Sequence, residues 1–319
     1  METSSRRYAF LGPVGTFTEA ALLQVAPDAE HLPMPDVVSA LDAVRQGTAD
    51  RAVVPIENSV EGGVSATLDT LSSGAPLVVV GEALVPISFV LAAPAGTRLE
   101  DVRAIATHPH AWAQCRGSVA RLVPGAVHVP ATSTAAAGAL LAERAAAGEP
   151  RGSVGYDAAL MAPHSAAAYG LQVLAAGVED NPGAVTRFVV VGRPGRVPAR
   201  TGADKTTLFV HLPHDDAGAL LTMLEQFATR GVNLSRIESR PLGDALGRYA
   251  FSIDAEGHLE DERIWATLQG LHRVCPRVVF LGSYPRADRR PVSPAPGFAD
   301  EDYAAARAWV ESLRGDGPA

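Results

Sequence analysis

Residues 52–59 read Ala-Val-Val-Pro-Ile-Glu-Asn-Ser, an apolar run of strand length that ends in polar side chains. Short Val-, Ile- and Ala-rich runs of this kind alternate with helical patterns from Arg7 to about Gly192. The alternation predicts an α/β fold, and Ser, Thr or Asp suited to capping precedes several of the helical patterns. Further strands are expected at 76–80, 88–92, 104–107 and 186–191, and helices at 16–25, 37–46, 64–72, 111–122 and 133–147.

A different pattern follows residues 193–202, whose prolines, glycines and arginines are typical of a linker. Beyond it we expect a strand, a helix, two strands joined by a Gly-containing turn, a helix and a strand, which is the ferredoxin-like βαββαβ order. The sequence therefore predicts domains at 7–192 and 203–285, followed by a Pro-rich tail at 286–319 with a short helix from residue 300 to 313. The elements of the second domain are expected at 205–212, 217–230, 232–240, 249–255, 260–274 and 277–282.

Composition limits the possible partners. The chain has 319 residues, 47% of them hydrophobic, with a net charge of −8 and no long run of Lys or Arg. Such a charge argues against nucleic acid or an anionic membrane as partner, and a small molecule is expected instead. The N-terminus has no long apolar signal core, and no run of about 20 apolar residues predicts a transmembrane helix, so a cytoplasmic protein is expected.

The metal-binding residue types are sparse. Cys115 and Cys275 fall in different predicted domains, so two reduced, packed thiols are expected rather than a disulfide or a metal site. His108-Pro109-His110 has no further carboxylate or histidine beside it at the spacing of metal ligands. No metal site is therefore predicted.

Three polar segments stand where strands end or begin. Glu57, Asn58 and Ser59 end one strand, Thr132-Ser133-Thr134 precedes a helix, and Thr186-Arg187-Phe188 opens a strand. Ligands of α/β proteins bind at strand ends, and hydroxyls at a helix N-terminus suit a carboxylate. The sequence predicts one anion-binding cleft, although a turn, a helix cap and a solvated strand end are the ordinary alternatives for each segment.

Two features refine this prediction. Residues 12–19 join the first strand to the first helix, where backbone N–H groups favour an anion, and Thr16 or Thr18 is the expected helix cap. This loop matches neither a phosphate loop nor a dinucleotide fingerprint. Arg187 is able to clamp a carboxylate, but strand alternation directs Thr186 and Phe188 to one face and Arg187 to the other.

These segments resemble the prephenate dehydratase family. The likeness rests on Gly-Pro-x-Gly-Thr-Phe at 12–17, Pro-Ile-Glu-Asn-Ser at 55–59, His-Pro at 108–109 with Gln-Cys at 114–115, Thr-Ser-Thr at 132–134 and Thr-Arg-Phe at 186–188. Residues 203–285 look like an ACT regulatory domain, since Gly-Ala-Leu at 218–220 and Glu-Ser-Arg-Pro at 238–241 match its motifs. The resemblance covers the chain from Arg7 to Pro285.

The resemblance implies conversion of prephenate to phenylpyruvate, without a cofactor, between two lobes of a periplasmic-binding-protein-like (type II) domain. It implies that Thr186 is catalytic, and Glu57 is our second candidate because it is the only carboxyl in these motifs able to supply a proton. The substrate-binding residues are then expected to be Thr16, Asn58, Ser59, Thr132, Ser133, Thr134, Arg187 and Phe188.

The ACT-like region implies that L-phenylalanine is an effector and that the protein is a homodimer or homotetramer. Its expected binding residues are Gly218, Ala219, Leu220, Asn233, Leu234, Glu238 and Ser239. Two alternatives remain open from the motifs. An arogenate dehydratase would make phenylalanine directly, and a non-catalytic amino-acid sensor would use the same binding fold.

Overall fold

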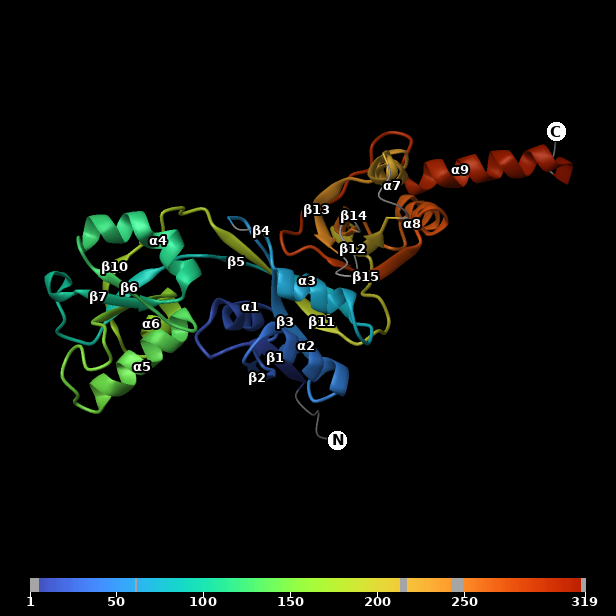
Figure 1. The fold of residues 1–319 in the computed structure, drawn as a ribbon. Helices are drawn as coiled ribbons and strands as arrows, with labels where there is room; N and C mark the ends of the chain where they lie inside the picture. Colours follow the sequence, from blue (N-terminus) through green and yellow to red (C-terminus); the bar gives the residue numbers. More distant parts are fainter. Residues whose placement is uncertain (1–5, 61, 213–216, 242–248, 317–319) are drawn as a thin grey trace. The chain divides into compact units, whose positions relative to one another are not determined.

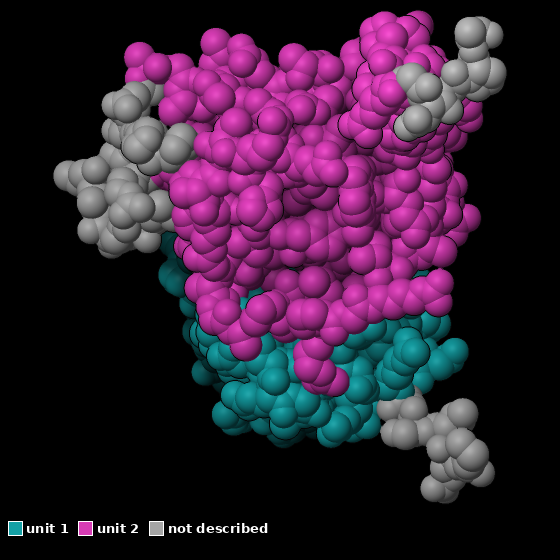
Figure 2. Space-filling model, turned by 90° about the vertical axis from the view of Figure 1, so that its right-hand side faces the viewer, with its two compact units in different colours: residues 1–64, 83–188 teal, residues 65–82, 189–319 magenta. Residues whose placement is uncertain are grey.

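The computed structural model describes residues 6–60, 62–212, 217–241 and 249–316, which form a mixed α/β fold (Figure 1). Two compact units divide the chain (Figure 2). Unit 1 comprises Met1–Val64 and Ala83–Phe188, and unit 2 comprises Ser65–Glu82 and Val189–Ala319. The predicted α/β fold is confirmed, whereas the predicted domain boundaries stay a prediction.

The first sheet has six strands. Its order is β2 (Glu30–Met34), β1 (Arg7–Leu11), β3 (Arg51–Asn58), β11 (Val185–Gly192) and β5 (Val78–Pro86), and β4 (Gly62–Gly63) pairs with β3. Strand β1 runs parallel to both of its neighbours. The helices that follow β1, β2 and β4 along the chain are α1 (Phe17–Val25), α2 (Val37–Gln46) and α3 (Ser65–Ser72).

Helix α2 has the bounds that its capping residues predict. The carboxylate of Asp36 accepts a hydrogen bond from the backbone N–H of Ser39 at 2.7 Å, and Gly47 ends the helix with a φ of 78°. An acidic N-cap satisfies an N–H group that has no partner in the helix, and glycine tolerates the left-handed conformation. Local chemistry is sufficient to fix both ends of this helix.

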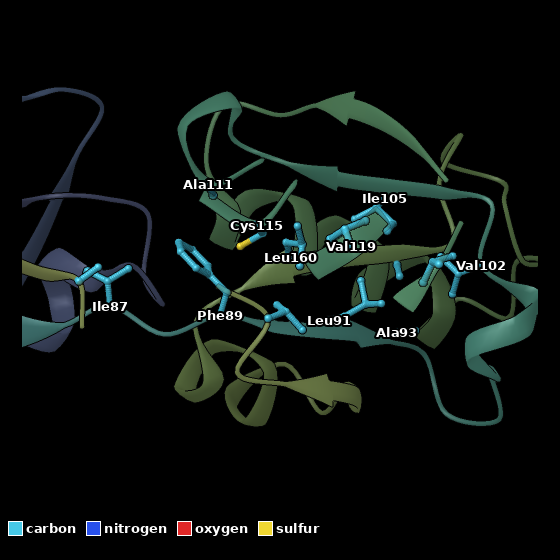
Figure 3. Close-up of a cluster of buried hydrophobic side chains, with 14 residues drawn as sticks. Ile87, Phe89, Leu91, Ala93, Val102, Ile105, Ala111, Cys115, Val119 and Leu160 are labelled. Atoms are coloured by element: carbon cyan, nitrogen blue, oxygen red, sulfur yellow. The ribbon is translucent and has the colours of Figure 1, made fainter. Parts of the chain in front are cut away.

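The second sheet has five strands, all in unit 1. Its order is β10 (Gln172–Ala176), β6 (Val90–Ala93), β9 (Ala158–Met161), β7 (Ala104–Thr107) and β8 (Val127–Pro130). The helices of this part are α4 (Pro109–Leu122), α5 (Thr134–Ala146) and α6 (Pro163–Ala168), with a short 3-10 turn at Leu99–Asp101. Side chains of α4 pack on this sheet in a buried cluster that includes Phe89, Leu91, Ile105, Cys115 and Leu160 (Figure 3).

The third sheet has four antiparallel strands, all in unit 2. Its order is β13 (Leu234–Pro241), β14 (Tyr249–Glu256), β12 (Asp204–His211) and β15 (Arg277–Pro285). With α7 (Ala219–Ala228) and α8 (Glu262–Val274), these strands follow the predicted βαββαβ order. The Gly-containing turn predicted between β13 and β14 falls at residues 242–248, which, like residues 213–216, lie outside the described residues.

The tail contains the predicted helix, α9 (Asp300–Glu311), which continues as a π-helical turn at Ser312–Asp316. It contacts the rest of unit 2, because Arg307 forms a bidentate ion pair with Glu262 at 2.6 and 2.7 Å. Cys115 and Cys275 are buried, free thiols. Within the ranges given above, every helix is too short or too polar to cross a membrane, and the cytoplasmic location stays a prediction.

Candidate active site

Unit 1 contains a cavity of about 280 Å³. Its walls come from loops that follow strands of both the six-stranded and the five-stranded sheet. Loops at strand ends are a frequent position for ligand sites in α/β proteins. The described lining residues are Leu11, Gly12, Thr16, Phe17, Thr18, Pro35, Asn58, Ile87, Phe89, His108, His110, Ala111, Gln114, Thr132, Ser133, Thr134 and Thr186.

The N-termini of three helices meet at this cavity. Thr16 is the N-cap of α1, His108 the N-cap of α4 and Ser133 the N-cap of α5, and all three residues line the cavity. Each cap accepts a hydrogen bond from its own helix, as Ser133 Oγ does from the N–H of Ala136 at 2.9 Å. The positive ends of three helix dipoles and their remaining N–H groups favour an anion.

The charge of the lining supports this electrostatic interpretation. None of the lining residues that the structure describes is Lys, Arg, Asp or Glu. An anion in this cavity would therefore be held by helix N-termini, hydroxyl groups and polar side chains without a formal charge. The Nδ1 atom of His108 accepts the N–H of His110 at 3.3 Å, so Nε2 is the ring nitrogen that would be available as a donor to such an anion.

Asn58 and Thr186 are the polar pair at the strand ends. The side-chain amide of Asn58 donates to Thr186 Oγ1 at 2.8 Å, and its Oδ1 accepts the backbone N–H of Val60 at 2.8 Å. The Val60 N–H fixes the orientation of the amide, since only the oxygen of Asn58 is able to accept it. Thr186 Oγ1 is consequently an acceptor toward Asn58, which leaves its own proton for donation.

Glu57 and Arg187 form a second pair on the same two strands. Arg187 Nη1 lies 3.1 Å from Glu57 Oε2, and the arginine side chain is 7% exposed. Neither residue is among the described lining residues. Side chains alternate between the faces of a strand, so the pair lies on the face opposite to Asn58 and Thr186. The prediction that the side chains of Arg187 and Thr186 point to opposite faces agrees with the lining, which includes Thr186 and not Arg187.

Two other predicted substrate residues also lie outside the lining. Ser59 links the end of β3 to β11 by two hydrogen bonds. Its N–H donates to Val185 O and its Oγ accepts the N–H of Val185, both at 2.9 Å. Phe188 is 2% exposed and part of the core. The apolar wall is formed instead by Ile87, Phe17 and Phe89, and the two phenyl rings contact edge to face with centroids 5.5 Å apart.

Some lining residues were not predicted as site residues from the sequence. They include Phe17, Ile87, Phe89 and Gln114, together with His108 and His110, which we had considered only as metal ligands. A signal for three of them was available, since Phe17, His108 and Gln114 belong to the segments that carry the family resemblance. The remaining three lie outside those segments.

The predicted effector residues of unit 2 lie at the two ends of α7. Gly218, the N-cap, has a φ of 93°, and Ala219 and Leu220 begin the helix. Asn233 and Leu234 follow its other end, and Asn233 Nδ2 donates to Glu256 Oε2 at 3.0 Å. A helix of 10 residues is about 15 Å long, so one amino acid cannot contact both ends in a single chain. Glu238 and Ser239 lie on the edge strand β13.

A cavity formed by helix N-termini, hydroxyls and an aromatic wall defines a protein that binds a small organic anion. The prephenate dehydratase family model matches residues 8–196. Prephenate dehydratase of Mycolicibacterium vanbaalenii is 45% identical over 321 residues, covering 96% of this chain and 97% of the relative. The chain belongs to the prephenate dehydratase family.

Solved structures extend the comparison. Prephenate dehydratase from Arthrobacter aurescens, solved in complex with L-Phe, is 55% identical with a TM-score of 0.88, covering 97% of this chain and 99% of that one. GqqA, described as a novel type of quorum-quenching acylase, is 32% identical with a TM-score of 0.77, covering 89% of this chain and 100% of that one. Relatives of this fold thus carry more than one described activity.

Proposed function

We propose that the protein is a prephenate dehydratase, a hydro-lyase that converts prephenate to phenylpyruvate, carbon dioxide and water in phenylalanine biosynthesis. Prephenate carries two carboxylates and a ring hydroxyl. The observation that carries the proposal is the convergence of three helix N-termini and the Asn58–Thr186 pair on one cavity. The relatives named above support the same activity.

In the proposed reaction, the bond between the ring and its carboxylate breaks and the electron pair enters the ring. The bond from the ring to its hydroxyl breaks as the ring becomes aromatic, and one proton from solvent is consumed to release water. Thr186 donates to the departing oxygen and is reprotonated, so it acts as a relay rather than as a strong acid. Thr16, Thr132, Ser133 and Thr134 bind the carboxylates, and Phe17 and Phe89 orient the ring.

Glu57 and Arg187 support this chemistry from the other face of the strands. Their ion pair joins β3 to β11 and thereby holds Asn58 beside Thr186. In this proposal Glu57 is a positioning residue, and the proton donor to the leaving hydroxyl is Thr186. Asn58 is the polar residue that orients the Thr186 hydroxyl.

The arogenate alternative differs in one substrate group. Arogenate carries an ammonium where prephenate carries a keto oxygen, and a site for it is expected to supply a carboxylate. The described lining residues include none, which favours prephenate. The acylase described for GqqA would need a base to activate a nucleophile. The described partner of the Thr186 hydroxyl is the Asn58 amide, which cannot accept a proton at neutral pH.

For unit 2, we infer an ACT regulatory domain at 203–285. The catalytic domain is assigned to residues 7–192, with the type II periplasmic-binding-protein plan. The βαββαβ order and the L-Phe complex of the Arthrobacter relative support this assignment. Because five of the seven proposed effector residues lie at the two ends of α7, two chains must each supply one end to bind a single phenylalanine. A homodimer, or a homotetramer made of two such dimers, therefore follows from the effector proposal.

The test is incubation of the purified protein with prephenate, with arogenate and with an acylated amide in separate reactions. Each reaction is followed with and without added L-phenylalanine, and product formation is measured by chromatography. We expect phenylpyruvate from prephenate and a lower rate when L-phenylalanine is present. Preferential turnover of arogenate would change the substrate, and release of a free acid from the amide alone would replace the proposed function.

A further inference from the structure

Helix α6 contacts the loop that carries Thr16 into the candidate active site. The hydroxyl of Ser165 donates to the carbonyl oxygen of Gly15, and the phenol of Tyr169 donates to the carbonyl oxygen of Val14 at 2.7 Å. The loop follows β1 of the six-stranded sheet, whereas α6 follows β9 of the five-stranded sheet. Both hydrogen bonds lie within unit 1 and link segments about 150 residues apart.

We infer that Ser165 and Tyr169 form a latch, defined by these two hydrogen bonds, that sets the width of the active-site cavity. The inference rests on the proposed function, because it assigns the two residues a role in positioning the substrate sites. Neither of them is among the described lining residues, so they act through the loop and not on the substrate.

Gly15 makes the close approach of α6 possible. Its φ of 87° is a conformation that residues with a side chain rarely adopt. A Cβ at this position would lie 2.9 Å from Tyr169 Oη, closer than real Cβ contacts, and 3.2 Å from Ser165 Oγ, tighter than most of them. The N–H of Gly15 also donates to Glu19 Oε2 at 2.6 Å. The Val14–Gly15 peptide group is therefore held by both Glu19 and Tyr169, and the Gly15–Thr16 peptide group is held by Ser165.

The latch determines where Thr16 stands relative to the other anion-binding groups. Thr16 is the next residue after Gly15 and caps α1, whereas Ser133 and His108 cap helices that follow strands of the five-stranded sheet. Fixing the loop to α6 thus fixes the N-terminus of α1 against those of α4 and α5. A substrate with two carboxylates requires a defined separation between such sites.

Both latch residues are suited to a permanent hydrogen bond. Ser165 is fully buried, so leaving the Gly15 carbonyl without its donor would cost free energy. Burial and, to a smaller extent, the charge of Glu19 raise the pKa of Tyr169 above its ordinary value. The phenol therefore keeps its proton across the working pH range and remains a donor.

The test compares Tyr169→Phe, Ser165→Ala and the double variant with wild type. A matched control is Tyr156→Phe, because the buried Tyr156 phenol donates to the Ala137 carbonyl at 2.9 Å in the same unit without touching the loop. Each latch variant is expected to raise KM for prephenate about two- to tenfold, the range of one hydrogen bond, with kcat within about twofold. Tyr156→Phe is expected to lower thermal stability and leave KM unchanged.

Hydrogen exchange of the Gly15 and Thr16 amides in the substrate-free protein is the second readout. It is expected to accelerate in both latch variants and not in the Tyr156 control. Unchanged KM and unchanged exchange, or an equal rise of KM in the control, would overturn the latch. If wild type fails to convert prephenate, the proposed function fails, and the exchange rates still decide whether the latch holds the loop.

Discussion

Arg240 donates two hydrogen bonds to Asp69, from Nε to Oδ1 at 3.0 Å and from Nη2 to Oδ2 at 2.7 Å. Its Nη1 also donates to Ser65 Oγ at 2.9 Å. All three residues belong to unit 2. Arg240 directly follows the predicted effector residues Glu238 and Ser239, whereas Asp69 lies in α3, which follows the cavity residue Asn58 along the chain. The strand that carries two of the predicted effector residues therefore contacts the helix that follows β3 and β4 along the chain.

We expect Arg240→Ala and Asp69→Asn each to reduce maximal inhibition by L-phenylalanine, and the double variant to be no worse than either single one. The side chain of Asp69 is 55% exposed, so the loss of folding stability should stay within about 1 kcal/mol. A double-mutant cycle on the inhibition curve measures the coupling. Arg307→Ala, which breaks the bidentate pair with Glu262, is the matched control, and equal loss of inhibition there would contradict the prediction.

Thr186→Ala should lower kcat at least about 100-fold, because proton donation by a positioned group contributes roughly that much. The free energy of unfolding should change by about 1 kcal/mol, the value of the hydrogen bond with Asn58. Thr186→Ser keeps the hydroxyl and is expected to retain measurable turnover. Steady-state kinetics together with urea unfolding separate the two effects, and near-normal turnover of Thr186→Ala would remove Thr186 from the mechanism.

Glu57→Gln should lower kcat less than about tenfold, since Glu57 faces Arg187 and lies outside the described cavity lining. The uncharged amide still accepts a hydrogen bond from the guanidinium, so β3 and β11 should stay joined. The variant is assayed at saturating prephenate beside Thr186→Ala. A loss as large as that of Thr186→Ala would identify Glu57 as the proton donor instead.

Cys115 should resist alkylation in the folded protein at pH 8. Burial, with smaller contributions from the charges of Asp180 and Glu179, raises its pKa to about 12. The thiolate is the reactive form, so a thiol reagent is expected to modify Cys115 only after unfolding. Peptide mass mapping before and after denaturation measures this, and rapid modification of native Cys115 would contradict it.

The same pKa shift predicts a pH dependence of stability. Above about pH 8.5 the unfolded thiol loses its proton whereas the folded thiol keeps its proton, so the folded state binds more protons and the free energy of unfolding falls as pH rises. The slope from this group is at most about 1.4 kcal/mol per pH unit. Cys115→Ala should unfold with a shallower dependence between pH 8.5 and 10, and an unchanged slope would exclude Cys115 as its source.

Elements that depend on local signals could be predicted from the order of residues. Helix α2 has its predicted bounds because Asp36 caps one end and Gly47 the other. The βαββαβ order of unit 2 followed from hydrophobic periodicity between glycine- and proline-containing turns. Strand β9, in contrast, was not predicted, since Ala158–Met161 consists of Ala, Leu and Met, which favour helices unless burial in a sheet overrides that preference.

The candidate site divides in the same way. Sequence motifs selected Thr16, Asn58, Thr186 and the segment Thr132–Thr134, all of which line the cavity, because polar residues at strand ends and helix caps are visible in the order of residues. Strand alternation predicted that Arg187 lies on the face opposite to Thr186, but the sequence could not pair Arg187 with Glu57, nor bring Phe89 and His108 to the cavity. Those positions depend on which strands become neighbours. The pairing of β3 with β11 is stabilised by hydrogen bonds between residues more than 100 positions apart, which exist only in the folded chain.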